Sequence, residues 1–214
     1  MHCQILKLGF HLNSFAQCVL IRLYSSFGRM DLASVVFDEI IERDFACWNA
    51  MISGYAKIGC MKKARNVFDQ MPQRNVVSWN ALIDGCFKTG LIVDAKQLFD
   101  EMGQRDLVSW GVMINGYVKN CCFKEALILF EEMMVENLEL DRVVIVSALC
   151  ACAHLVALDL GKEIHGYIEK RSKFKADVIL ETSVIDMYSK CGCVRNARKI
   201  FDRMVREMFM LGVP

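Results

Sequence analysis

The chain has 214 residues, of which 54% are hydrophobic and 24% are charged, so its composition is not that of a disordered protein. Lys and Arg together number 26 and Asp and Glu 25, and a net charge of +1 excludes recognition of nucleic acid or anionic membrane by bulk charge alone. Only two prolines occur, Pro72 and Pro214, which favours helices over a loop-rich or all-β fold.

A long block of sequence occurs twice at a fixed interval. The stretch WNAMISGYAKIGCMKKARNVFDQM begins at Trp48, and WNALIDGCFKTGLIVDAKQLFDEM begins 31 residues later at Trp79. Small and aromatic positions keep the same step over a longer range, namely Ala33, Ala64, Ala95 and Ala126, and Phe37, Phe68, Phe99 and Phe130. The register then shifts by 71 residues, which divides into units of 35 and 36. Repeats of this length predict a stacked array of one structural unit.

Each unit is predicted to contain two helices, as residues 76–106 illustrate. The apolar face of the first helix is formed at helical spacing by Trp79, Leu82, Ile83 and Cys86. Lys88-Thr89-Gly90 then places a cation in the last turn and a glycine just after it, which is a typical helix stop. The apolar face of the second helix carries Ala95, Leu98, Phe99 and Met102. One such hairpin cannot bury its own apolar face, so neighbouring units must cover it.

The residues of this unit carry a resemblance to a known family. VVSWNALIDGCFKTGLIVDAKQLFDEM resembles the pentatricopeptide repeat, with Trp-Asn at the start of the first helix, a Gly-Cys-x-Lys-x-Gly segment between the helices and Ala-x-x-Leu-Phe-Asp-x-Met in the second. The tetratricopeptide signature is not present. The resemblance implies an all-α fold, an α-solenoid wound as a right-handed superhelix of stacked helix-turn-helix repeats.

The mixed unit lengths resemble the plant class of this family that alternates P, L and S variants. In chain order the predicted units are the end of a truncated L-type repeat (1–13), three S-type repeats (14–44, 45–75 and 76–106), a P-type repeat (107–141), an L-type repeat (142–177), an S-type repeat with a degenerate end (178–208) and a tail (209–214). Because Met1 falls in the middle of a repeat, we expect the chain to be a fragment of a larger protein. Neither end resembles a polar capping repeat. We therefore expect the terminal helices to fray or to associate with other molecules through their exposed apolar faces.

Members of this family bind single-stranded RNA with one base per repeat, as other helical-repeat RNA-binding proteins do. The resemblance implies that the fifth residue of the first helix and the last residue of the unit read one base together. In unit 45–75 these residues are Asn49 and Asn75, for which the family rule implies a pyrimidine, C before U. In unit 76–106 they are Asn80 and Asp106, which implies U before C.

Two further residues, Ala46 and Val77, occupy the position at which the family packs an apolar side chain against base faces. A structural interpretation of the asparagines stays open, because Asn near the start of a helix is frequently a cap that contacts only its own backbone.

The other units depart from the readable combinations. Their weaker candidates are Cys18 with Asp44, Gly111 with Asp141, Val146 with Asp177, and Thr182, whose partner position falls at Met208. Cysteine is a poor hydrogen-bonding group, and neither glycine nor valine can read a base edge. Thr182 would favour a purine.

No pattern in the sequence predicts catalysis. The cytidine-deaminase chemistry attached to some proteins of this class needs a His-x-Glu zinc motif and a Pro-Cys-x-x-Cys pair. None of the four histidines is followed by Glu at the second position after it, and His154 and His165 are interpreted as helix-surface or interhelix residues. We therefore expect no enzyme, no cofactor, no metal and no small-molecule substrate. The three tryptophans share one repeat position, which favours core packing over a stacking platform.

Eleven cysteines are present, and no Cys-x-x-Cys pair occurs among them. No signal peptide precedes them, so a disulfide framework and a zinc site are both disfavoured, and the thiols are interpreted as small apolar residues packed between helices in a reducing compartment. The longest apolar stretch, residues 143–158, falls short of the roughly 20 residues of a membrane helix, and no membrane segment is expected.

The predicted function is sequence-specific binding of single-stranded organellar RNA, in site recognition for C-to-U editing or in other RNA processing. Editing-factor proteins or a deaminase acting in trans are the further partners that the family implies. Mitochondrion or plastid is the implied location, although the chain carries no targeting peptide of its own. Two alternatives stay open: a protein-interaction solenoid and a truncated, inactive piece of a larger protein.

Overall fold

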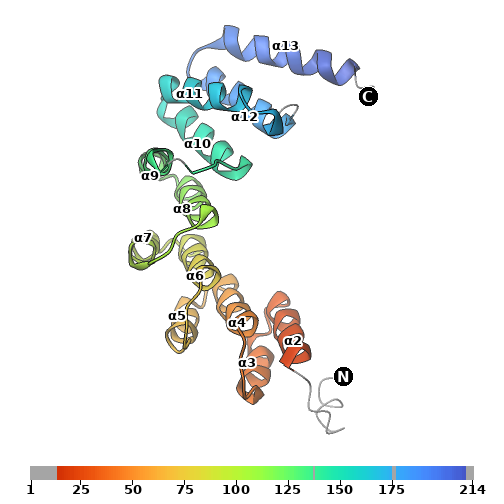
Figure 1. The fold of residues 1–214 in the computed structure, drawn as a ribbon, viewed down its shortest axis with the longest axis vertical. Coiled ribbons are helices and arrows are strands. Elements are labelled where there is room, and N and C mark those ends of the chain that lie inside the picture. The colour runs from red at the N-terminus through yellow and green to blue at the C-terminus, as the bar shows by residue number, and fades with distance from the viewer. Residues whose placement is uncertain (1–13, 137, 175–176, 211–214) are drawn as a thin grey trace. The chain divides into compact units, whose positions relative to one another are not determined.

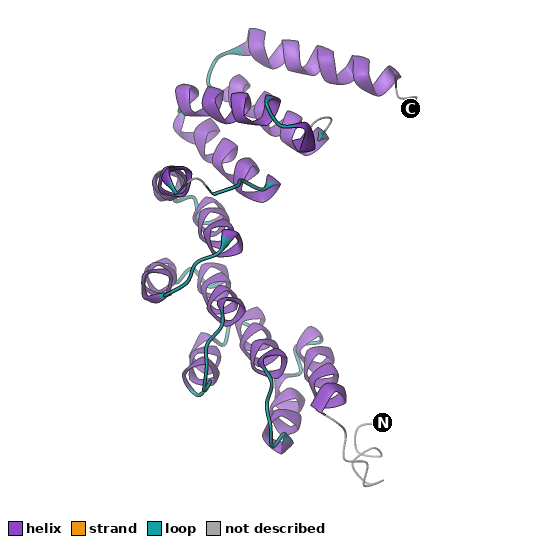
Figure 2. Ribbon diagram, viewed as in Figure 1, coloured by secondary structure: helices purple, strands orange, loops and turns teal. Residues whose placement is uncertain are grey.

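The computed structural model describes residues 14–136, 138–174 and 177–210, and their secondary structure is entirely helical (Figure 1). Within these ranges no strand occurs, as the colouring by secondary structure also shows (Figure 2). The predicted all-α class is thereby confirmed. No helix in the described ranges has both the length and the apolar character that crossing a membrane requires.

The chain divides into two units, Met1–Gln104 and Arg105–Pro214, which are described separately. The first carries α2 (Ser14–Ser26), α3 (Met30–Glu39), α4 (Phe45–Lys57), α5 (Met61–Asp69), α6 (Val76–Lys88) and α7 (Ile92–Glu101). The second carries α8 (Leu107–Lys119), α9 (Phe123–Val135), α10 (Arg142–Leu155), α11 (Leu158–Glu169), the short 3-10 helix η1 (Ser172–Phe174), α12 (Val178–Lys190) and α13 (Val194–Met210).

The helices form consecutive hairpins, in which the even-numbered helix comes first and is called the A-helix, and the odd-numbered one is called the B-helix. Within the first unit the A-helices α2, α4 and α6 pack on one another in that order, and within the second unit α8, α10 and α12 do the same (Figure 1). The A-helices begin at Ser14, Phe45, Val76, Leu107, Arg142 and Val178, the first residues of the six repeat units laid out above. Their assignment to S, P and L variants stays a prediction.

Short sequence signals set where the A-helices end. In α6 the last helical residue is Lys88, Thr89 is the C-cap, and Gly90 follows with φ +75°. Glycine suits this left-handed conformation because it has no Cβ to clash with the neighbouring carbonyl. The same turn in the next repeat uses Cys121 at φ +59°, so the fold tolerates a side chain there.

Two repeated residue types form the core between the helices of a hairpin. The alanines Ala33, Ala64, Ala95 and Ala126 have no exposed surface. The phenylalanines four residues later, Phe37, Phe68, Phe99 and Phe130, are also buried, and two of them contact a tryptophan ring of the next repeat. The rings of Phe68 and Trp79 meet edge to face at 4.7 Å between centroids, and those of Phe37 and Trp48 do so at 4.9 Å.

Glycines allow successive A-helices of the first unit to approach closely. A Cβ atom added at Gly85 of α6 would lie 2.6 Å from the Cβ of Ala56 on α4. One added at Gly54 of α4 would lie 2.6 Å from the sulfur of Met30 and 2.7 Å from the Ser25 hydroxyl oxygen. Gly54 and Gly85 therefore set the spacing of the A-helices in the first unit, and with it the spacing of any residues that these helices present together.

Candidate functional site

A groove on the A-helices of the first unit brings three of the predicted site residues together. It has a volume of about 410 Å³ and is lined by Arg22, Ser25, Ser26, Ala46, Asn49, Ala50, Ser53, Gly54, Lys57 and Val77. We call it the A-helix groove. Ala46 and Val77, the two predicted packing residues, line it together with the predicted reading residue Asn49. The groove therefore combines apolar surface, one amide and two cations.

The amides of Asn49 and Asn80 each contain a buried oxygen without a protein partner. In both residues Oδ1 is buried and makes no hydrogen bond within the described part of the chain, and the same holds for the hydroxyl oxygen of Ser25. Leaving such an atom unpaired costs about 1–3 kcal/mol. Asn49 and Ser25 both line the A-helix groove. Rotation of the Asn49 amide by half a turn exchanges its oxygen and nitrogen, so the groove offers an uncommitted donor and acceptor.

The predicted second reading residues all lie at the N-termini of the next A-helices. Asp44, Asn75, Asp106, Asp141 and Asp177 are the N-caps of α4, α6, α8, α10 and α12. In the first four the side-chain Oδ1 accepts a backbone hydrogen bond of 2.8 Å from the third residue of the helix. Asp177 accepts two, from Ile179 at 3.1 Å and Leu180 at 3.2 Å. The cap interpretation that the sequence suggested for the asparagines thus applies to the last residue of each unit.

Capping leaves one side-chain atom uncommitted, and its chemistry depends on the residue. At Asn75 the cap uses Oδ1, so the free atom is Nδ2, a hydrogen-bond donor. At Asp106 both bonds from Ser109 end on Oδ1, so the free atom is Oδ2, an acceptor. Asn and Asp are almost equivalent as N-caps, yet they present opposite groups to a ligand.

Replacing Asn75 by alanine is expected to lower the free energy of unfolding by about 1 kcal/mol, because α6 loses its capping box with Ser78. Asn75→Asp keeps an acceptor at the cap and is expected to leave stability almost unchanged. Urea denaturation followed by circular dichroism measures both. Equal losses in the two variants would contradict the assignment of Asn75 as a cap.

The weaker candidates differ in how well they could reach a ligand. Cys18 is buried and Val146 is half-buried. Gly111 is also buried and carries no side chain. Thr182 is exposed, but its hydroxyl donates to the backbone oxygen of Val178 at 2.6 Å. Two readable pairs were predicted. Asn49 and Asn75 both lie in the first structural unit, Met1–Gln104, whereas Asn80 lies in the first and Asp106 in the second.

The two cations at the groove differ in whether they have a hydrogen-bond partner. Lys57 Nζ donates to the backbone oxygen of Ser26 at 3.0 Å, which holds the ammonium at the C-terminus of α2. Arg22 is exposed and has no partner in the described structure. Lys88, which follows Lys57 by 31 residues, is instead paired with Asp84 in its own helix. The groove beside Asn49 thus carries two cations, of which only Arg22 is unpaired in the described residues.

The two central histidines lie at the surface and between helices. The ring of His154 is exposed and stacks on Phe123 at 4.1 Å between centroids. His165 Nδ1 lies 3.1 Å from the Tyr188 hydroxyl and Nε2 lies 3.4 Å from Glu169. Burial lowers the pKa of His165, while Glu169 opposes that shift.

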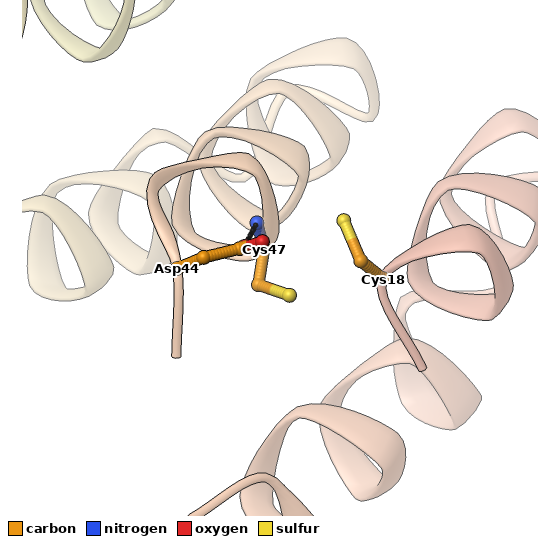
Figure 3. Close-up of side chains that lie close together, drawn as sticks. All are labelled: Cys18, Asp44 and Cys47. Carbon is orange, nitrogen blue, oxygen red and sulfur yellow. Dashed lines mark hydrogen bonds between the residues drawn. The ribbon is translucent and has the colours of Figure 1, made fainter. Parts of the chain in front are cut away.

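One side-chain cluster was missed by the sequence reasoning. The ligand atoms of Cys18, Asp44 and Cys47 all lie within 4.8 Å of one another (Figure 3). No Cys-x-x-Cys motif marks this cluster, because its residues come from α2 and from the start of α4. The signal that would have found them is positional, because Cys18 and Cys47 occupy the fifth and third places of consecutive A-helices.

Comparison with known proteins agrees with the helical repeat. The family model described as PPR repeat, for pentatricopeptide repeat, matches residues 18–45, 46–76, 108–138 and 182–209, and the model described as PPR repeat family matches residues 74–107.

Among curated relatives of Arabidopsis thaliana, the pentatricopeptide repeat-containing protein At5g39350 is 30% identical over 207 residues, 97% of this chain and 21% of its own length. The protein At3g57430, chloroplastic, is also 30% identical over 207 residues, which cover 97% of this chain and 17% of its length. The chain thus spans less than a quarter of the length of either relative.

Among solved structures, the pentatricopeptide repeat protein PPR10 in complex with an 18-nucleotide psaJ RNA element aligns with a TM-score of 0.68. The sequences are 18% identical, and the alignment covers 95% of this chain and 31% of the other. PPR10 from maize crystallised on its own aligns with a TM-score of 0.60 at 20% identity, over 84% of this chain and 27% of that one. These likenesses show the fold, a helical-repeat solenoid.

Proposed function

Because the chain belongs to the pentatricopeptide repeat family, we propose that it binds single-stranded RNA and that the A-helix groove of the first unit reads one base. The observation that carries the proposal is the convergence of Asn49, Ala46 and Val77 in this groove. A structural neighbour, PPR10, is described in complex with an RNA element, which supports the same activity here. The proposed activity is recognition, and it assigns no catalytic step to this chain.

The groove has the three kinds of surface that single-stranded nucleic acid requires. Ala46 and Val77 come from successive A-helices, and both side chains are exposed, so a flat base can pack against them. Asn49 lines the groove, and because its Oδ1 is unpaired within the described residues, its amide can offer a donor or, after rotation by half a turn, an acceptor to a base edge. Arg22 and Lys57 supply positive charge for the phosphates, which the near-neutral chain does not provide elsewhere in bulk.

The cap residue supplies a physical reason for the choice between the two pyrimidines. Cytosine and uracil differ at N3, which accepts a hydrogen bond in cytosine and donates one in uracil. The free Nδ2 of Asn75 is a donor and suits cytosine, directly or through a water molecule, whereas the free Oδ2 of an aspartate suits uracil. This agrees with the preference of C over U that the family rule gives for Asn49 with Asn75.

The biological setting that we propose is RNA processing in a plant organelle, including recognition of C-to-U editing sites. One relative is named as chloroplastic, which supports an organellar location without distinguishing plastid from mitochondrion. In an editing role, editing-factor proteins or a deaminase would act in trans on the RNA that this array positions.

The test is fluorescence anisotropy of the purified chain with short single-stranded RNAs varied at two adjacent positions, at one fixed salt concentration. Asn75→Asp is expected to move the preference at one base from C to U, and Asn49→Thr is expected to move it from a pyrimidine to A. One base contact contributes about 1–3 kcal/mol, so the preference should change by about 5-fold to 150-fold. Asn75→Asp keeps the helix cap, so a loss of folding cannot mimic the result.

A matched control is Asn66→Thr, which makes the same substitution at an exposed site on the B-helix α5. It is expected to leave the base preference unchanged. If the wild type, Asn49→Thr and Asn75→Asp all bind every strand alike, the groove does not read RNA. That outcome would favour an array that binds proteins or an inactive piece of a larger protein.

A further inference from the structure

We propose that Cys18, Asp44 and Cys47 bind one divalent cation of the zinc class between the first two A-helices. Cys18 lies on α2, Asp44 immediately precedes α4, and Cys47 is in its first turn. The two sulfur atoms and one carboxylate oxygen of Asp44 lie within 4.8 Å of one another, and the two thiols face each other across the helix interface (Figure 3). The proposal stands apart from RNA binding, since it needs only these three side chains.

Two of the three residues in the cluster are buried between helices. The exposed fraction is 6% for Cys18 and zero for Cys47, so both sulfurs are held in the packed interface. Asp44 is exposed and is oriented by its cap bond, in which Oδ1 accepts from the backbone nitrogen of Cys47 at 2.8 Å. A hydrogen bond to a coordinating carboxylate is the kind of outer contact that fixes metal ligands in place.

The donor set selects the class of cation. Thiolates favour zinc and softer ions, whereas magnesium and calcium prefer oxygen ligands. Zinc–sulfur bonds of about 2.3 Å in a tetrahedron place two sulfurs about 3.8 Å apart, so the cluster needs a contraction of at most about 1 Å. Three protein ligands leave the fourth position to a water molecule.

Proton balance makes the proposed binding dependent on pH. Burial, with contributions from Asp44 and Cys18, raises the pKa of Cys47 above its usual range. The cation forms two metal–sulfur bonds, and both thiol protons pass to solvent. A centre of two thiolates, one carboxylate and a divalent cation has a net charge of −1, which the N-terminus of α4 favours.

The proposed ion would have two consequences for the array. It would link α2 to α4 and so stabilise the first unit. It would also occupy Cys18 and Asp44, the pair predicted to read a base in unit 14–44. That position would then hold a metal centre in place of a base-reading pair.

The experiment is titration of the reduced protein with Cd²⁺, followed by its ultraviolet charge-transfer absorption with thiolate and then by displacement with Zn²⁺. The wild type is expected to bind one equivalent that Cys18→Ser and Cys47→Ser do not bind. Because binding releases two thiol protons, the apparent affinity for Cd²⁺ should fall as the pH is lowered. Asp44→Asn, which keeps the helix cap, should weaken binding by about 10-fold or more.

Cys60→Ser is the matched control, since Cys60 lies in the same structural unit but outside the cluster. It is expected to bind cadmium as the wild type does. An unchanged number of cadmium equivalents in Cys18→Ser and Cys47→Ser would place the metal on other cysteines and overturn the proposal. Absence of any charge-transfer band in the wild type would overturn it equally. Circular dichroism establishes that each variant is folded, and Asp44→Asn decides the question if a serine variant is not.

Discussion

Replacing Phe68 by alanine is expected to lower the free energy of unfolding by about 3–5 kcal/mol, the usual loss for a phenylalanine removed from a packed core. The side chain has no exposed surface, and its ring meets the edge of Trp79 in the next repeat. The guanidinium of Arg74 also lies over the ring, 4.8 Å from its centroid. Alanine would therefore leave a cavity at the junction of two repeats. Urea denaturation followed by circular dichroism measures the loss.

Phe201→Ala is the control for this prediction because Phe201 occupies the same repeat position on α13. Its side chain is 50% exposed, so much less apolar surface is removed from contact. We expect a loss of less than about 1 kcal/mol. Similar losses at Phe68 and Phe201 would show that the interface between repeats contributes little to stability.

Replacing Gly85 by alanine is expected to destabilise the chain even though alanine is the better helix former. The new Cβ would lie 2.6 Å from the Cβ of Ala56, an atom bonded directly to the backbone of α4. The two A-helices must separate to accommodate it, at a cost of about 1–3 kcal/mol. The gain in helix propensity offsets about 0.5–1 kcal/mol of that cost. A net loss of about 1–2 kcal/mol should appear as a lower urea midpoint.

Two other glycines separate close approach from helix propensity. At Gly166 of α11 an added Cβ meets nothing within 4 Å, so Gly166→Ala should stabilise the protein by about 0.5–1 kcal/mol. At Gly54 the nearest atoms belong to the side chains of Met30 and Ser25, which can move, so Gly54→Ala should cost less than Gly85→Ala. A stabilising effect of alanine at all three glycines would contradict the role assigned to Gly85.

The same variant connects stability with the proposed function. Ala46 of α4 and Val77 of α6 line the A-helix groove together with Asn49, and Gly85 lies where those two helices approach closely. Separating α4 from α6 would change the gap into which a base is proposed to fit. Gly85→Ala should therefore weaken RNA binding at temperatures where the protein is still folded.

The helical repeat and much of its local detail follow from the order of residue types along the chain. A fixed step between like residues predicted the hairpins, and the six A-helices begin at the residues where the units were divided. The helix stop at Gly90 and the buried alanines such as Ala95 also follow from sequence. These features depend on residues close together in the chain or on one period, so the order of residue types is sufficient to specify them.

For the last residue of a repeat unit, the sequence predicted base reading but not helix capping. The family resemblance assigned Asn75 to base reading, and the structure places it as the cap of α6. Both assignments are compatible because capping uses Oδ1 and leaves Nδ2 free. Which atom is free depends on how the chain enters the helix, and residue identity alone does not specify that.

Contacts between side chains of different repeats depend on tertiary packing. The approach of Cys18 to Cys47, the A-helix groove around Asn49 and the close contact of Gly85 with Ala56 all depend on the distance between stacked A-helices. That distance results from the packing of many side chains at once, so no single motif encodes it. A repeat in the sequence specifies the unit, whereas the surfaces formed between units arise when the units stack.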